Sequence, residues 1–459
     1  MDNSKIVLEN SKIQTLNFIE NCIISGNVEI KDNCEIDNLT LRDLTITKSI
    51  WFFNSSINKG CGIHKVNVNG LDFENTKVES NILISGIETK TLSFIKSDFF
   101  KSIDVFCGNV STLVIGQSSF TNNFDLNGVG LGNLSIIDSD FDRSININNQ
   151  LVSDGIPIQL NINEVFIRSN KLGDQFVINS MGSTINSLKL ELKKALVGSF
   201  YFNFCDIHKT KITGDNYNSN IVFDHCNFNK IEFDYFNNYS NLSIISAKAF
   251  SADSELSIVH SNLGKTNFYN VSWESFEKTI ITHSILTEII TANIKWFDDE
   301  KLLTGSDEYF FEDFSQRKEI YRQLKYAMEK QGDRISSLMF KSLEFKAYKN
   351  ELFVDSKWWR IWGWSTWKRF CDKIVLLFGQ INNFGQNWIK PIIWIFIGTL
   401  FFYLFIVVAI SEKLSFTINF SSESFNATKS EICNHIYAYP KLLNPTNSVN
   451  KAFYATPQC

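Results

Sequence analysis

The chain has 459 residues, and its 44 Lys and Arg against 49 Asp and Glu give a formal net charge of −5. A mildly acidic chain does not suit a protein that binds nucleic acid through many phosphate contacts, so we expect no nucleic-acid partner. The nine cysteines include no CxxC pair, which excludes the common zinc-ribbon and thioredoxin-like signatures.

The first 150 residues repeat with a period of 21. One apolar column consists of Ile50, Leu71, Leu92, Leu113 and Leu134. A Ser/Thr column lies five positions later and consists of Ser55, Thr76, Ser97, Ser118 and Ser139. Apolar residues at i and i+2 indicate short strands with one buried face. Short strands at a constant period predict coils that stack into a parallel β-solenoid.

The same pattern continues less regularly as far as residue 297, so we predict one mainly β domain over residues 1–297, a β-helix of about a dozen coils of about 21 residues. We expect the coils to be right-handed and the Ser/Thr hydroxyls to bond backbone groups at a corner. The 41 Phe are expected to stack in the narrow lumen. The solenoid cysteines are expected to be free packing thiols in a reducing compartment.

Two groups of aspartates on the solenoid are of the kind that serve in acid–base catalysis or in cation binding. Asp98 and Asp140 fall in one column, as the carboxylates of a carbohydrate-active β-helix would, but Ser119 interrupts the pair. Asp138, Asp140 and Asp142 form the densest acidic spot, for which a weak cation site is the alternative to a solvated turn. We favour solvated corner residues for both sets.

His208 and His225 lie near coil corners about one coil apart, and we expect surface histidines rather than a catalytic or metal pair. The chain contains no phosphate-binding loop followed by a helix, and no GxSxG, HExxH or Cys–His signature. We therefore predict no enzyme activity, no catalytic residue, no metal site and no cofactor.

The pattern changes to helical near residue 300. Residues 298–355 are predicted to form a neck of two antiparallel helices, 313–331 and 334–352, in an αα-hairpin. Gly332 is placed to end the first helix and Asp333 to cap the second.

Residues 356–390 form a segment rich in Trp, Lys and Arg, which are side chains that favour the bilayer interface. The predicted interface residues are Trp358, Trp359, Arg360, Trp362, Trp364, Trp367, Lys368, Arg369, Trp388 and Lys390. Residues 391–410 carry no charge, and at about 1.5 Å per residue they match a hydrocarbon core of about 30 Å. We predict one transmembrane helix there, with Pro391 in its opening turn.

The cations before this span outnumber those after it, so the positive-inside rule places the solenoid in the cytoplasm. The N-terminus has no basic region followed by an apolar one, so we expect no cleaved signal peptide. Residues 411–459 are then expected outside, where Cys433 and Cys459 are candidates for a disulfide.

The run Glu319-Ile-Tyr-Arg-Gln-Leu-Lys325, followed by Glu329-Lys-Gln-Gly-Asp333, Phe340 and Phe345-Lys-Ala-Tyr348, resembles a helical segment of certain bacterial membrane proteins. In those proteins it joins a pentapeptide-repeat-like solenoid to a C-terminal membrane region, and Phe384-Gly-Gln-Asn-Trp-Ile-Lys-Pro391 resembles the start of their first membrane helix. The resemblance implies a bacterial inner-membrane protein of a mostly uncharacterised kind, some of which are grouped with two-helix ion-channel modules. The 21-residue period of this chain is not a multiple of the five-residue repeat of those proteins.

Two functional hypotheses follow. The favoured one is a single-pass, membrane-anchored, non-catalytic scaffold or sensor whose partners are the bilayer and an unidentified protein bound on the solenoid. The alternative is an oligomeric membrane effector, or an ion-channel-like protein gated by the solenoid, because a lone span must assemble with copies of itself to enclose a conduit. A carbohydrate-active β-helix enzyme is the least favoured hypothesis.

Overall fold

The structure is a computed structural model. It describes residues 5–19, 21–148, 160–169, 171–193, 196–304, 313–354, 371–376, 379, 389–410, 436 and 439–440. The chain divides into two compact units, Met1–Ser337 and Leu338–Cys459. The first unit holds the strands and one helix, and the second holds most of one helix and all of another.

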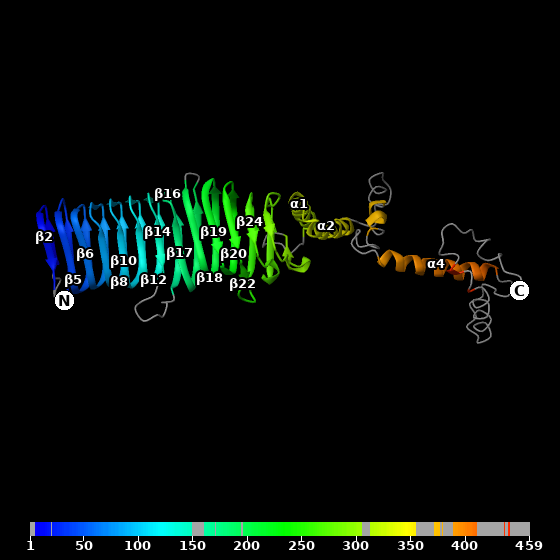
Figure 1. Cartoon of the computed structure of the whole chain (residues 1–459), viewed down its shortest axis with the longest axis horizontal. Helices are drawn as coiled ribbons and strands as arrows, with labels where there is room; N and C mark the ends of the chain where they lie inside the picture. Colours follow the sequence, from blue (N-terminus) through cyan, green and yellow to red (C-terminus); the bar gives the residue numbers. More distant parts are fainter. Residues whose placement is uncertain are drawn as a thin grey trace. The chain divides into compact units, whose positions relative to one another are not determined.

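The first unit is a parallel β-solenoid of about 13 turns with a spacing of about 22 residues, which confirms the predicted fold class (Figure 1). Its strands are β1 (Lys5–Glu9), β2 (Lys12–Phe18), β3 (Cys22–Ile24), β4 (Asn27–Lys31), β5 (Glu35–Phe53), β6 (Ser56–Glu74), β7 (Lys77–Val78), β8 (Ile82–Ile95), β9 (Asp98–Phe99), β10 (Ile103–Gly116), β11 (Ser119–Phe120), β12 (Phe124–Ile137), β13 (Asp140–Phe141), β14 (Ile145–Asn148), β15 (Asn161–Arg168), β16 (Lys171–Leu172), β17 (Phe176–Leu192), β18 (Val197–Asn216), β19 (Asn218–Asp224), β20 (Asn227–Asn238), β21 (Asn241–Ile245), β22 (Lys248–Ala249), β23 (Glu255–Val259), β24 (Thr266–Tyr269), β25 (Lys278–Thr282), β26 (Ile290–Ala292) and β27 (Leu302–Leu303), with short 3-10 helices η1 (Trp273–Ser275) and η2 (Asp299–Lys301).

The 21-residue register of the sequence is the register of the sheet. β10 pairs in parallel with β8 and β12, and Leu113 lies opposite Leu92 and Leu134. Further along, Asp140 pairs with Lys171, 31 positions later, so this coil holds ten more residues than the regular period. Insertions of this kind raise the mean spacing above 21. The last paired strand lies at Leu302–Leu303, a few residues past the predicted end at 297.

The lumen is filled by the apolar columns, as predicted. The Phe52 ring stacks on Phe73 at 4.8 Å and Phe73 stacks on Phe94 at 5.4 Å. A second stack runs through Phe99, Phe120 and Phe141, at 4.8 and 4.5 Å. All six rings are buried, so these ladders contribute a large share of the apolar area that stabilises the coils.

The buried Ser/Thr column bonds backbone groups at a corner, which confirms the prediction. The Ser97 hydroxyl donates to the carbonyls of Ile95 at 2.8 Å and Phe73 at 3.2 Å, and it accepts from the Thr76 N–H at 3.0 Å. The residue before each hydroxyl has a left-handed backbone, with φ of 50° at Asn75 and Lys96. At the corner a backbone N–H has no carbonyl partner in a neighbouring strand. The hydroxyl of the next coil accepts a hydrogen bond from this N–H instead.

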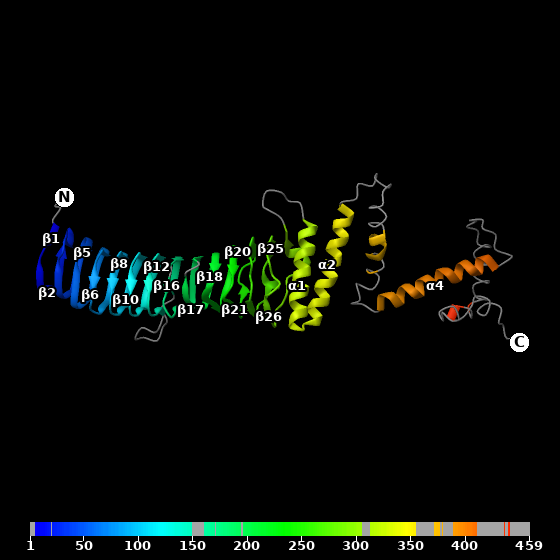
Figure 2. The same ribbon diagram turned by 90° about the horizontal axis from the view of Figure 1, so that it is seen from above.

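Helix α1 (Phe314–Gln331) closes the C-terminal end of the solenoid, beside β26 in Figure 2. Its inner face buries Ile320, Tyr321, Leu324, Ala327 and Met328. The Gln323 side-chain oxygen Oε1 accepts from the Leu286 N–H at 2.8 Å. The Gln331 side chain accepts from the Thr291 N–H at 2.7 Å and donates to the Ile289 carbonyl at 2.8 Å. Through these contacts α1, which the sequence pattern places in the predicted neck 298–355, lies within the first compact unit, Met1–Ser337.

Helices α2 (Arg334–Val354) and α4 (Ile389–Ile410) follow in the part of the chain that the structure describes. Gly332 ends α1 with φ of 80°, and the Asp333 carboxylate accepts from the Ser336 N–H at 3.1 Å at the start of α2, so both predicted helix caps are confirmed. α4 begins two residues before Pro391, which lies in its first turn, where a missing N–H breaks no helical hydrogen bond.

Candidate functional surfaces

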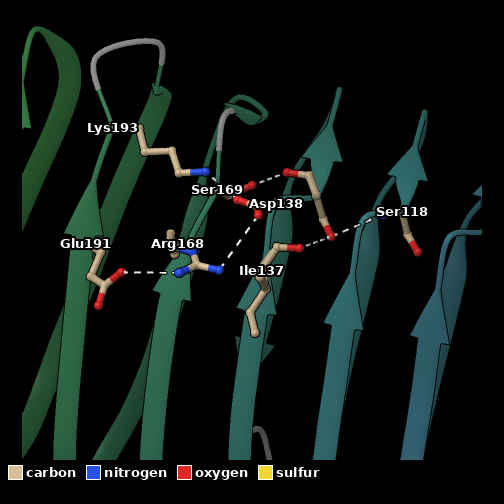
Figure 3. Close-up of polar contacts among 8 residues, drawn as sticks. Ser118, Ile137, Asp138, Arg168, Ser169, Glu191 and Lys193 are labelled. Atoms are coloured by element: carbon tan, nitrogen blue, oxygen red, sulfur yellow. Dashed lines mark hydrogen bonds and ion pairs between the residues drawn. The ribbon is translucent and has the colours of Figure 1, made fainter.

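The predicted acidic spot is occupied by the protein's own cations (Figure 3). The Asp138 carboxylate accepts a short hydrogen bond from the Lys193 ammonium, and its second oxygen lies 3.7 Å from the Arg168 guanidinium, which also faces Glu191 at 3.9 Å. The hydrogen bond from Lys193 lowers the pKa of the Asp138 carboxyl below its ordinary value, and the charges of Lys193 and Arg168 act in the same direction.

The neighbouring carboxylate is paired in the same way. The Lys171 ammonium lies 2.5 Å from Asp142, and this contact raises the pKa of Lys171. A metal ion at this turn would have to displace two lysines. The weak cation site considered from the sequence is therefore not supported. Nor does any group of three or more His, Cys, Asp or Glu side chains fit a metal ion in the part of the chain that the structure describes.

The column containing Asp98 and Asp140 has the register that the sequence predicts. Ser119 pairs with both, and its hydroxyl donates to Asp98 at 2.5 Å. Lys77 precedes the column and Lys171 follows it. Both aspartates are exposed, Ser119 separates them, and Asp98 borders a shallow depression of about 290 Å³ lined mainly by amide, hydroxyl and lysine side chains. This arrangement suits solvated corner residues better than an acid–base pair.

The two histidines are not brought together. His208 contacts the edge of the Phe250 ring, while His225 stacks on Phe204 and bonds Asp224 at 2.8 Å. His225 borders a shallow depression of about 390 Å³ whose other lining residues are Asn227, Ser246, Ala247, Lys248, Asn270 and Ser272. Apart from His225 and Lys248, this lining consists of neutral hydroxyl and amide side chains and one alanine.

Sequence reasoning missed two sites where burial acts on a carboxylate. Burial raises the pKa of Asp72, which accepts from the Ser93 hydroxyl at 2.5 Å, and it raises the pKa of Asp104, where the charge of Asp125 one coil on adds to the effect. The spacing of 21 between Asp104 and Asp125 was the available signal. Asp72 lies within β6 and Asp104 within β10.

The described cysteines are free, and four of the six in the solenoid are buried. Burial raises the pKa of the Cys61 thiol to about 12. A thiol with so high a pKa forms no reactive thiolate near neutrality, so Cys61 acts as a packing residue, as the sequence predicted.

The second unit contains one helix that is long and apolar enough to span a membrane, by the test of its described residues. Only 11% of its 18-residue apolar window is buried, and Phe401 is 70% exposed. The Tyr439 hydroxyl donates to the Phe396 carbonyl of α4 at 2.9 Å, and the Tyr439 ring contacts Tyr403.

Of the predicted interface residues, Lys390 is the one within the described part of the chain. Lys390 lies exposed in the first turn of α4. The other predicted interface residues, from Trp358 to Trp388, lie outside the described residues, as do both members of the proposed Cys433–Cys459 pair.

No protein-family model, curated protein or solved structure matches this chain.

Proposed function

We propose that this protein is a membrane-anchored, non-catalytic scaffold or sensor of a bacterial cytoplasmic membrane, whose β-solenoid binds a protein partner in the cytoplasm. The observation that carries the proposal is the exposure of nearly the whole apolar surface of α4. The helix would be anchored by Lys390 and the Trp-rich segment before it, and the resemblance to solenoid-bearing bacterial membrane proteins agrees with this arrangement.

Several properties of α4 favour a bilayer over water. Its 22 residues extend about 33 Å, close to the thickness of a hydrocarbon core. An exposed apolar surface of this size in water marks an interaction site or promotes aggregation. The backbone polar groups of a helix bond within the segment, and the Thr399 hydroxyl bonds the Ile395 carbonyl at 2.7 Å. The helix therefore brings few unsatisfied polar groups into lipid.

The solenoid favours binding over chemistry. Neighbouring coils are joined across their outer faces by ion pairs such as Lys211–Asp234 at 2.7 Å and Lys189–Glu164 at 2.8 Å. Stacked coils hold these polar side chains at fixed positions along one face, which preorganises a long surface for a partner.

Membrane anchoring is tested by fractionation of the full chain. Ile397→Arg combined with Phe401→Arg places two charges near the centre of α4, at about 2.5–3.5 kcal/mol each on translocon scales, and should move the protein out of the alkali-resistant membrane fraction. The matched control is Leu83→Arg with Phe106→Arg, on exposed apolar positions of the solenoid. Equal fractionation of the two double variants would overturn the proposal.

Sidedness and assembly are tested together. A reporter that is active on only one side of the membrane, fused after Cys459, should report the outside, and detergent sizing of the same preparation should give a monomer or dimer. A closed ring of four or more subunits would instead favour the oligomeric effector or ion-channel-like alternative and would require conductance measurements.

A further inference from the structure

Among the described residues, the first coil of the solenoid is an uncovered apolar layer. Ile6, Leu8, Ile13, Leu16 and Phe18 point into the lumen but are only half-buried. Their counterparts one coil on are buried: Val28, Ile30, Ile36, Leu39 and Leu41. The difference arises because no other described residue covers the first coil.

The same end also presents free strand edges. β1 pairs only with β4, and β2 and β3 pair only with β5, within the described residues. Ile23 in β3 is 75% exposed. An apolar surface next to unpaired backbone groups forms a template for another strand, and monomeric proteins normally block such edges.

The sequence of β1 is complementary to itself. It reads Lys5-Ile-Val-Leu-Glu9, with Lys5, Val7 and Glu9 outward and the other two residues inward. Antiparallel pairing of two copies about Val7 places Lys5 opposite Glu9 on the outer face. On the inner face it places Ile6 opposite Leu8. A shift of one residue would set either Lys5 against Leu8 or Glu9 against Ile6, so only one register matches both faces.

We propose that the first coil of the solenoid is an interface for a second copy of this chain, in a two-fold symmetric dimer joined by antiparallel pairing of β1. A two-fold axis through Val7 makes the contact isologous and closed, so it ends at a dimer rather than a fibre. Residues 5–24 offer close to the roughly 20–30 residues per partner of a standard interface. The inference is independent of the proposed membrane anchoring, because it uses no residue of α4.

Charge exchange tests the pairing in the full chain, purified in detergent. Lys5→Glu alone and Glu9→Lys alone each set like charges opposite one another twice per dimer, and each should weaken self-association by about tenfold or more. An equal mixture of the two variants restores both opposite-charge pairs and should recover the dimer as a heterodimer. Within the chain Lys5 also pairs with Glu29 at 2.7 Å and Glu9 with Lys31 at 2.8 Å, so Lys5→Gln and Glu9→Gln, which lose these pairs without creating like charges, serve as folding controls.

A disulfide test locates the axis. In a background with Ser at Cys22, Cys107, Cys371, Cys433 and Cys459, Val7→Cys should cross-link on oxidation, because facing Cα atoms of an antiparallel pair lie about 4.5–5.5 Å apart. Val114→Cys lies in the same column five coils on and should not cross-link. A monomeric wild type at micromolar concentration, or a mixture that stays monomeric, would overturn the proposal.

Discussion

Gly108 provides a sharp test of how closely neighbouring coils approach at a corner. Its φ is +153°, and a Cβ built there would lie 2.3 Å from the Ile87 carbonyl oxygen and 2.8 Å from the Ile87 nitrogen. These are backbone atoms of the adjacent coil, so they cannot rotate away as a side chain would. Gly108→Ala must therefore shift the ladder or change φ, at about 1–3 kcal/mol for the strained backbone and a similar amount for the crowded contact.

The matched control is Gly116→Ala, at the end of the same strand, β10. No atom lies within 4 Å of a Cβ at Gly116, and its φ is outside the left-handed range. Urea unfolding followed by the far-ultraviolet signal of the strands should place Gly108→Ala about 2–6 kcal/mol below the wild type, with the control near zero. Amide hydrogen exchange should show the loss of protection first around residues 87 and 108. Equal stability of the two variants would refute the close approach.

Three further outcomes are expected. Asp72→Asn should raise the free energy of unfolding at neutral pH. The pKa of Asp72 is raised in the folded state, so the wild type loses stability as the pH rises above about 4 and Asp72 ionises, whereas the variant does not. The denaturant midpoints of the variant and the wild type should therefore converge at acid pH. Phe94→Ala should cost about 3–5 kcal/mol, since its buried ring contacts four others, whereas Phe106→Ala at the surface should cost far less by the same unfolding assay. Gln331→Ala removes hydrogen bonds worth about 0.5–1.5 kcal/mol each, and amide exchange should accelerate in the last coils only.

Much of the fold could be predicted because stacking is local in a periodic chain. Each residue contacts its counterpart one period later. The presence of the same residue type at Leu92 and Leu113, or at Ser97 and Ser118, therefore predicts a contact between the two positions. Helix caps are equally local, which is why Gly332 and Asp333 could be assigned without tertiary information. The apolar span of α4 is a property of composition alone.

The charge pairing of the surfaces could not be predicted, because it depends on contacts between residues that are not one period apart. Arg168 and Lys193 reach Asp138 across an insertion that breaks the register, so the acidic spot was seen in the sequence without its counter-ions. The closure of the last coils by α1 and the openness of the first coil likewise follow from which elements meet in space. The sequence determined the repeating coil, because its side chains interact at a constant separation along the chain. Only the tertiary structure decided which charges are neutralised and which end is covered, because those interactions join residues at irregular separations.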